Sequence, residues 1–478
     1  MCYHTETLNQ GVVLSELCDM EILKYFDFAE LRKIARLALP IFLGSMASMG
    51  MAFTDTVMAG HLSAADLAGI ALACTFIFTL TISGSGFALA TTPVISADHG
   101  SGNYKLLLEH FYQIVFIAFG LSVATVTLLA LSSLLLPFFE LEPKVYRTAL
   151  EYLLISLLGI PGYFVFHALR TLTEGMSYTR LTMYVSFIAL FINAGLNYIF
   201  MYGKLGIPAM GGSGSAVSTV MVQTFMALFQ WYRIRRISYF SMLQFRLRDF
   251  RPDFAVIGKF VRLGFPIATA LFFEVAFFTF MGLVVTFMGT SMIAANQIYY
   301  NLMSIIYMLP FALSQVVAIR IGFTRGENNL DKTFRAIVTC YTAGLVLALA
   351  TAVTTYLCRN YVGALYTDDP EVIAIVSGSF VIISLYQLAD FCQINGIGIL
   401  RGFQDNRIIT VASVCVYWLI GLPVSLILCF TDWLGGPYEF RGLWSGLCVS
   451  LYVLAVIYTV RVASDMRRIK KSGWDSGR

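Results

Sequence analysis

The strongest constraint on this chain is a series of twelve apolar segments, each close to the ~20 residues that a helix needs to cross a bilayer core of ~30 Å. A backbone inside a bilayer must satisfy its own hydrogen bonds, so each segment is predicted to be a helix. The chain is 58% hydrophobic and 13% charged, whereas soluble proteins are about 25% charged. We therefore predict an all-α polytopic membrane protein with twelve transmembrane helices. The predicted spans are 37–59, 68–95, 112–136, 150–169, 181–202, 214–232, 263–287, 293–319, 336–357, 372–400, 408–430 and 442–460.

The distribution of basic residues predicts the orientation of these spans. With both termini and the even-numbered connections placed inside, 27 of the 32 Lys and Arg residues are cytoplasmic. The five on the outer side are Lys144, Arg147, Lys204, Arg359 and Arg441. Because cytoplasmic loops are enriched in Lys and Arg, we expect cytoplasmic termini in a plasma membrane, here a bacterial inner membrane. The basic connection 233–262 is interpreted as a topological lock that touches anionic membrane lipid.

The first 36 residues carry six acids and four bases without an apolar block. They are therefore not a signal peptide. Residues 29–36 are predicted to form a short amphipathic helix at the inner membrane surface.

An internal repeat divides the chain into two halves. LALP at 37–40 precedes LGFP at 263–266 by 226 positions, and HGSGN at 99–103 precedes RGENN at 325–329 by the same interval. Six spans is an even number, so the two copies have the same orientation, and we predict a pseudo-two-fold axis along the membrane normal. The predicted parts are an N-terminal segment (1–36), an N-lobe (37–232), a basic linker (233–262), a C-lobe (263–461) and a cytoplasmic tail (462–478).

Three carboxylates lie within predicted spans that contain no Lys or Arg to neutralise them. Glu274 lies near the middle of the seventh span, Asp390 in the inner half of the tenth and Asp55 toward the outer end of the first. An unpaired carboxylate in an apolar setting takes up H+ readily, or recruits Na+ if other oxygens gather around it. Glu274 and Asp390 belong to one half, so they are candidates for a shared cation site. The alternatives are a protonated Glu bonded to a neighbouring helix and a helix cap at Asp55.

Other polar and aromatic residues are candidates for lining a cavity. Asn193 and Asn197 lie four apart on one helix face and are placed beside Asp55. Asn296 and Gln297 lie in the eighth span near Glu274, although hydrogen bonding between packed helices explains such residues equally well. Several tyrosines are candidates for stacking on an organic cation, namely Tyr299, Tyr300, Tyr307 and Tyr386.

Several function classes lack local support. The sequence contains no G-x-S-x-G, H-E-x-x-H or P-loop pattern, so no enzyme activity and no cofactor are expected. The nine cysteines form no C-x-x-C pair and indicate neither a zinc site nor a disulfide framework. Nucleic acid is not expected as a partner, because the basic residues are distributed by membrane topology.

Six motifs resemble those of the multidrug and toxic compound extrusion (MATE) family, in its NorM-type branch. They are LALPIFLGSMASMGMAFTDTVMAGHLSAADLAGIAL, LRTLTEGMSYTR, INAGLNYIFMYGKLGIP, LFFEVAFF, the Asn296-Gln297 region and QLADFCQINGIGILRGFQDNR. The resemblance covers most of the chain between Leu31 and Arg461. One position departs from the family pattern, because Ala97 stands where Gln is usual.

The resemblance implies two six-helix lobes that export hydrophobic, often cationic, organic compounds in exchange for Na+ or H+. It matches the family's cation-site acids to Glu274 and Asp390, and its first-lobe acid to Asp55 with Asn193 and Asn197. We expect a monomeric antiporter of small-molecule drugs. The alternative is a flippase of lipids or lipid-linked sugars with the same fold, which would be expected to carry more basic residues in its cavity.

Overall fold

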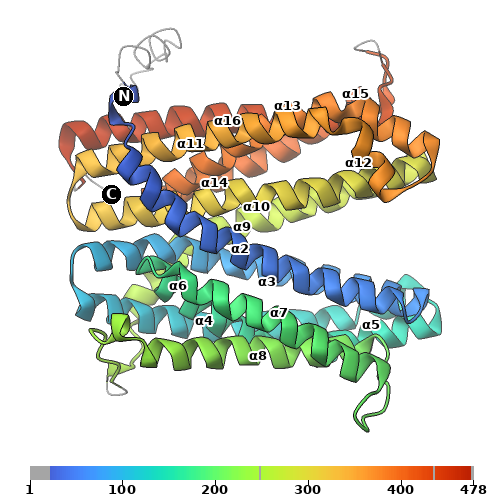
Figure 1. The fold of residues 1–478 in the computed structure, drawn as a ribbon, viewed down its shortest axis with the longest axis horizontal. Coiled ribbons are helices and arrows are strands. Elements are labelled where there is room, and N and C mark those ends of the chain that lie inside the picture. The colour runs from blue at the N-terminus through green and yellow to red at the C-terminus, as the bar shows by residue number, and fades with distance from the viewer. Residues whose placement is uncertain (1–21, 247–248, 434–435, 475–478) are drawn as a thin grey trace, which may run out of the picture.

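The computed structural model describes residues 22–246, 249–433 and 436–474, which form helices and loops without a strand. The first half of the chain contains the following elements in order: η1 (Ile22–Tyr25), α2 (Phe28–Gly60), α3 (Ala64–Gly100), α4 (Tyr104–Ser133), η2 (Leu136–Phe139), α5 (Pro143–Ser156), α6 (Ile160–Gly175), α7 (Thr179–Tyr202), α8 (Ser213–Arg236) and η3 (Ser238–Phe240). The axes of the long helices are roughly aligned, and successive helices run in opposite senses (Figure 1).

The second half repeats this pattern. Its elements are α9 (Phe254–Val285), η5 (Thr286–Met288), α10 (Thr290–Gly326), α11 (Leu330–Leu357), α12 (Arg359–Tyr366), α13 (Pro370–Gly402), α14 (Asn406–Cys415), the π-helical η6 (Val416–Gly421), α15 (Leu422–Phe430) and α16 (Glu439–Ser472). The segment α14–η6–α15 forms one nearly continuous span.

Ten of the described helical segments are long and apolar enough to cross a membrane, and the bent pair α5 and α6 makes eleven. The two helices of this pair meet at an angle of 49°. The twelfth helix, α8, packs against α7 and α6 but is too polar to pass the same criterion. The prediction of an all-α protein with twelve helices in two groups of six is confirmed.

One sequence-based prediction is wrong. Residues 29–36 do not form a separate surface helix, because α2 runs from Phe28 to Gly60 without a break. Asp27 caps this helix by accepting a hydrogen bond from the Ala29 N–H. Glu30, the one acid in residues 29–36, is only 4% exposed. The charge pattern suggested a solvated face, whereas the structure buries this carboxylate against a distant arginine.

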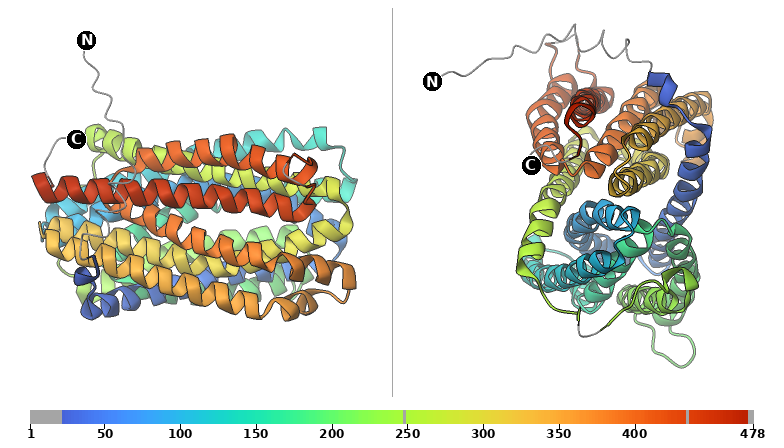
Figure 2. Two further views of the ribbon diagram at one scale, coloured as in Figure 1. Left: turned by 90° about the horizontal axis from the view of Figure 1, so that it is seen from above. Right: turned by 90° about the vertical axis from the view of Figure 1, so that its left-hand side faces the viewer.

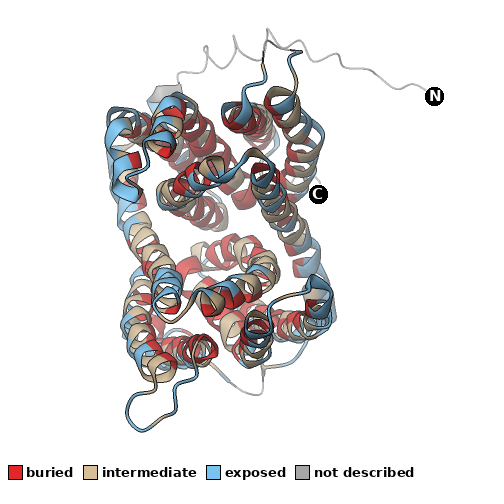
Figure 3. Ribbon diagram, turned by 90° about the vertical axis from the view of Figure 1, so that its right-hand side faces the viewer, coloured by how far each residue is buried: buried red, intermediate tan, exposed pale blue. Residues whose placement is uncertain are grey.

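Each half has its own buried core, and one helix from each half reaches into the other (Figures 2 and 3). Ile34 and Ile41 of α2 belong to the core of the second half. Conversely, Phe260 of α9 belongs to the core of the first half. The N-terminal parts of α2 and α9 therefore join the two halves on opposite sides of the bundle (Figure 2, right).

The repeat is visible in the helix caps. Asp27 and Asp253, 226 positions apart, cap α2 and α9 by the same side-chain hydrogen bond to the N–H two residues later. Asn103 and Asn329, also 226 apart, cap α4 and α11 by accepting from the N–H three residues later. Equivalent positions therefore begin equivalent helices, as the repeat predicts.

The two halves meet in a reciprocal backbone contact between α3 and α10. A Cβ atom on Gly100 would collide with the Phe323 carbonyl, and one on Gly326 would collide with the Ala97 carbonyl. Positions 97 and 323 are 226 apart, as are 100 and 326, so the same contact is made twice across a pseudo-two-fold axis. Beside it, the Ser96 hydroxyl donates to the Ile319 carbonyl at 2.7 Å.

These contacts lie at the end of the bundle near Ile22 and Trp474, which we call the termini end (Figure 1). An ion pair closes the same end: Glu30 Oε1 of α2 lies 2.6 Å from Arg320 Nε of α10. Asp27 adds a second link, because its N–H donates to Thr339 Oγ1 at 3.1 Å. The halves are therefore held together at the termini end by backbone packing and by buried charge.

We predict that Gly326→Ala opens the termini end. The new methyl group overlaps the Ala97 carbonyl, and overpacking of this kind costs about 1–3 kcal/mol. Spin labels at the exposed positions Lys105 and Asp331 should report longer distances by double electron–electron resonance. Gly282→Ala is the matched control, since nothing lies within 4 Å of its added Cβ. Equal distance distributions for both variants would contradict the importance of the contact.

We predict that Arg320→Gln lowers thermal stability substantially. The substitution leaves Glu30 buried with only the half-exposed Lys33 as a partner, and breaking a buried pair costs about 3 kcal/mol or more. Adding Glu30→Gln to the same protein should restore much of the loss. Lys332→Gln is the control, because its pair with Glu327 is exposed and is worth less than about 1 kcal/mol. A melting temperature no lower than that of this control would count against the ion pair.

Candidate functional site

Glu274 projects from the middle of α9. The helix is started by the Asp253 cap and continues through an apolar run, so Glu274 is carried well away from either end. Its side chain is partly exposed. Among the described residues, no hydrogen bond or ion pair to its carboxylate is present. A carboxylate within a membrane span that has no protein partner is an unusual and costly arrangement.

Asp390 lies on α13 and is 6% exposed. It interacts electrostatically with Glu274, so α9 and α13 bring the two acids of the second half near each other. Within the described part of the chain, its carboxylate also accepts no hydrogen bond. Among the described residues, the two acids thus form a pair without a hydrogen-bond donor. The pair either carries negative charge or binds protons or a cation.

Aromatic side chains surround this acid pair. Tyr307 of α10 and Tyr386 of α13 both interact electrostatically with Glu274 and Asp390. Tyr417 does so as well, and its ring stacks on Phe277 with the centroids 5.1 Å apart. Ring faces and phenolic oxygens near two carboxylates suit an organic cation or a small metal cation.

The π-helix η6 positions Tyr417. A π-helical turn is rare and concentrates at functional sites, because it shifts the register of the side chains that follow. Gln393 Nε2 of α13 donates to the Tyr417 hydroxyl at 3.5 Å. Sequence analysis missed both residues, since one Tyr and one Gln in an apolar run give no signal of a change in helix type.

The other predicted residues of the eighth span fall in different environments. Asn296 is buried and accepts a hydrogen bond from Trp444 Nε1 at 3.2 Å. Gln297 is exposed, and Tyr307 is partly exposed. Tyr299 differs from the expectation that it lines a cavity: it is fully buried and donates its hydroxyl to the Val376 carbonyl at 2.7 Å.

A second polar cluster lies in the first half. Asn197 Nδ2 and Asn193 Nδ2 of α7 donate to Asp55 Oδ1 of α2 at 2.6 and 3.1 Å. The hydroxyls of Ser215 and Thr219 on α8 lie beside the same carboxylate without forming a hydrogen bond of good geometry. The placement of both asparagines beside Asp55 agrees with the sequence-based expectation. Unlike Glu274, this acid has two amide donors.

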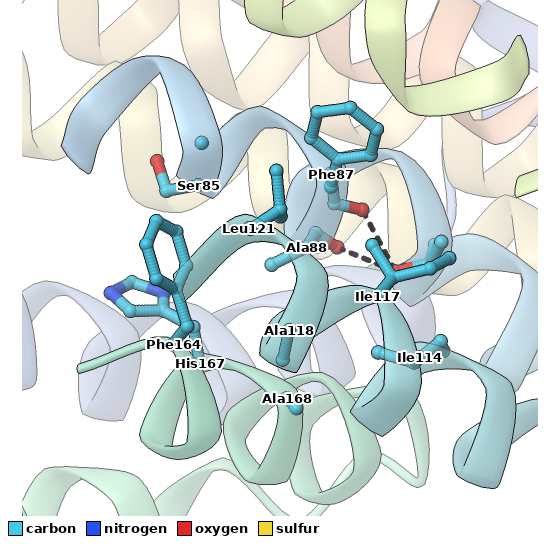
Figure 4. A pocket seen from close by; sticks show the side chains of 12 residues that line it. Ser85, Phe87, Ala88, Ile114, Ile117, Ala118, Leu121, Phe164, His167 and Ala168 are labelled. Carbon is cyan, nitrogen blue, oxygen red and sulfur yellow. Dashed lines mark hydrogen bonds between the residues drawn. The ribbon is translucent and has the colours of Figure 1, made fainter. Parts of the chain in front are cut away.

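A small apolar pocket lies between α3, α4 and α6. Figure 4 shows the rings of Phe164 and His167 side by side on its wall, opposite aliphatic side chains of α4. The hydroxyl of Thr91 in its wall is already bonded to the Phe87 carbonyl at 2.8 Å. This pocket lies within the first half and is separate from both carboxylate clusters.

No group of three or more His, Cys, Asp or Glu residues that could hold a metal ion occurs in the described part of the chain. A site for a transition metal is therefore not formed by these residues. The donors near the acid pair are carboxylate, phenol and amide oxygens, which suit a hard monovalent cation or protons.

Three basic residues lie directly after the ends of predicted spans. The helices are longer than the predicted spans. Arg170, Arg320 and Arg401 therefore lie within helices, although outside the predicted spans. Arg170 pairs with Glu174 at 2.7 Å, and Arg320 pairs with Glu30. Arg401 is different, because it is 2% exposed and, among the described residues, has no acidic partner.

Comparison with known proteins shows the family to which this sequence is similar. The sequence model of the MatE family matches residues 40–199 and 266–427, one segment in each half. Multidrug resistance protein MdtK of Pectobacterium atrosepticum is 35% identical over 434 residues, which cover 91% of this chain and 95% of the relative. MdtK of Yersinia enterocolitica is 34% identical with the same coverage.

Solved structures share the fold. The eukaryotic MATE transporter AtDTX14 superposes with a TM-score of 0.79 at 20% identity, over 92% of this chain and 98% of that one. An outward-facing multidrug resistance MATE family transporter gives a TM-score of 0.80 at 17% identity, over 93% and 97%. At these identities the likeness establishes the fold alone.

We predict that Asn197→Ala destabilises the first half through Asp55. Removal of the shorter of the two amide hydrogen bonds leaves the carboxylate under-satisfied, at a cost of about 1–3 kcal/mol. The melting temperature in detergent should fall, and it should fall less when Asp55→Asn is already present. A loss of the same size in both backgrounds would show that Asn197 acts independently of Asp55.

Proposed function

Because the chain belongs to the MatE family, we propose that it is a multidrug efflux antiporter. It exports hydrophobic or cationic organic compounds across the bacterial inner membrane in exchange for Na+ or H+. It works as a monomer surrounded by lipid and needs no cofactor. Support comes from the relatives, which carry the name multidrug resistance protein, and from the acid pair.

The single observation that carries this proposal is that Glu274 and Asp390, the acid pair, have no basic partner among the described residues. Two other buried acids are each neutralised by an arginine, Glu30 by Arg320 and Glu174 by Arg170. Glu274 and Asp390 share an apolar setting without such a partner, so their charge must be balanced by something that arrives from outside the protein. A coupling cation, Na+ or H+, is that balance in our proposal.

Exchange follows from competition at or near this pair. The cation binds Glu274 and Asp390 from the outer side and favours release of the drug; when the cation leaves on the inner side, a drug can bind again. The coupling is reciprocal: if the bound cation lowers the affinity for drug, the bound drug lowers the affinity for cation by the same factor. One charge that moves down ~100 mV supplies about 2.3 kcal/mol.

Alternating access uses the two halves as rocking bodies. We assign them to an N-lobe (37–232) and a C-lobe (263–461), with the basic segment 233–262 as the linker between them. The termini end is the cytoplasmic end in this assignment, in line with the excess of Lys and Arg there. The structure then corresponds to a state closed toward the cytoplasm, supported by the contact of Gly100 with Phe323 and the pair Glu30–Arg320.

The substrate is held by aromatic and amide side chains beside the acids. Tyr307 and Tyr386 offer ring faces near Glu274, and the exposed Gln297 offers an amide from the same helix as Tyr307. Cation–π contacts with such rings are worth about 0.5–2 kcal/mol and tolerate varied shapes. This tolerance suits a broad range of organic cations. Asp55 with its two asparagines is a second polar site in the other half.

We predict that Glu274→Gln abolishes export while the protein remains folded and inserted, because the uncharged amide cannot take up the coupling cation. Efflux of a fluorescent organic cation from proteoliposomes should be measured under an imposed Na+ gradient and, separately, under a pH gradient. Glu109→Gln changes an exposed carboxylate and is the control. Export that survives Glu274→Gln would overturn the role of this residue. Movement of fluorescent lipid, without movement of drug under either gradient, would favour a flippase.

A further inference from the structure

Arg401 is a buried positive charge without a counter-ion in the protein. It lies one residue before the end of α13 and is 2% exposed. Its guanidinium donates to two neutral oxygens of α10, from Nη2 to Ser314 Oγ at 2.7 Å and from Nη1 to Gln315 Oε1 at 3.3 Å. In the described part of the chain, no carboxylate pairs with it and its Nε has no hydrogen-bond partner.

Neutral partners leave the charge of this side chain in place. Hydroxyl and amide oxygens solvate a guanidinium but do not cancel its field, and a low local dielectric extends that field further than water would. A buried charge of this kind is costly and persists only where something offsets the cost. By contrast, Arg170, Arg320 and Lys33 are each paired with a buried carboxylate.

The helix geometry directs the charge toward the acid pair. Asp390 and Arg401 are eleven residues apart, which is three turns of α13, so both lie on the same face. The hydrogen bond to Ser314 places the guanidinium at the level of Gly398, which packs on the Ser314 backbone. From that level to Asp390 is eight residues, or roughly 12 Å along the axis.

Tyr307 lies close to the level of Asp390. It is seven residues before Ser314 on α10, so the two residues share a face. Its phenol interacts electrostatically with Glu274, Asp390 and Arg401. Asp390, the phenol and the guanidinium therefore form one series along α10 and α13, to which α9 adds Glu274.

We infer that Arg401 is a positioning residue for ion coupling, a fixed internal charge that weakens binding of the coupling cation to Glu274 and Asp390 so that the cation can leave. This inference rests on the proposed function. A cation driven inward by the membrane potential needs a site that releases it, since tight binding would stop the cycle. A permanent charge that repels the cation and stabilises the empty, anionic pair supplies this property.

The size of the effect follows from the separation. Two unit charges roughly 12 Å apart, at an effective dielectric constant of about 20, change cation affinity roughly tenfold. Such a change is large enough to measure and small enough to leave binding possible.

Two variants test the inference by removing the charge in different ways. Arg401→Gln deletes it, and Gln315→Glu neutralises it in place by setting a carboxylate beside Nη1. Binding of radioactive Na+ alone to purified protein at fixed pH, and the concentration of Na+ or H+ at half-maximal drug efflux, should both shift about tenfold toward tighter binding. The second variant keeps the test valid if the first does not fold.

Two controls separate charge from structure. Arg401→Lys keeps the charge with different hydrogen bonds, and Ser314→Ala removes one hydrogen bond from an intact arginine. Both should leave the cation dependence within about twofold of the unmodified protein. If Arg401→Gln and Gln315→Glu bind cation as the unmodified protein does, or if Ser314→Ala shifts affinity as much as they do, the inference is wrong. Failure of the unmodified protein to couple efflux to either cation would instead overturn the proposed function.

Discussion

The close approach of α3 and α10 at the pseudo-two-fold axis is the constraint on which the rest of the structure depends. Gly100 and Gly326 each bring a backbone carbonyl of the other half to a distance that no side chain would permit. Because the two positions are related by the repeat, one duplicated glycine produces both contacts. A side chain at either position would force the two backbones apart. The hydrogen bond of the Ser96 hydroxyl and the Glu30–Arg320 ion pair add to this backbone contact.

In this membrane protein, the acids that join the halves at the termini end have basic partners and, among the described residues, the two acids at mid-span do not. At the termini end, Glu30 and Asp27 of the first half meet Arg320 and Arg335 of the second. These pairs add attraction between the halves only while that end is closed. Nearer the middle of the bundle, Glu274 and Asp390 have no protein partner among the described residues. The presence or absence of an ion-pair partner therefore distinguishes the acids at the closure from the acid pair at mid-span, which burial alone does not do.

The sequence predicted the parts of this molecule that local pattern determines. Helix positions followed from apolar length, and the two halves followed from an offset of 226 that the caps Asp27 and Asp253 repeat in space. The spacing of four placed Asn193 and Asn197 on one helix face, and the family resemblance grouped them with Asp55. Pairings over long sequence separation could not be foreseen: Glu30 looked solvated because its partner lies 290 residues away. Arg401 was placed outside the membrane because span boundaries were drawn at the first charge, although a long side chain can turn back into the bundle.

The helix α10 connects the two functions that transport requires. Along its length it carries Tyr307 beside the acid pair, Ser314 against Arg401, and Arg320 and Gly326 at the closure. Pro310 lies between the first of these and the rest, and it removes one backbone hydrogen bond at the level where a tilt would have to begin. A change in charge at the acid pair therefore acts on the same helix whose far end holds the halves together. In the proposed exchange cycle, which reverses the end that is closed, no long-range pathway beyond this one helix is needed to link cation binding to closure.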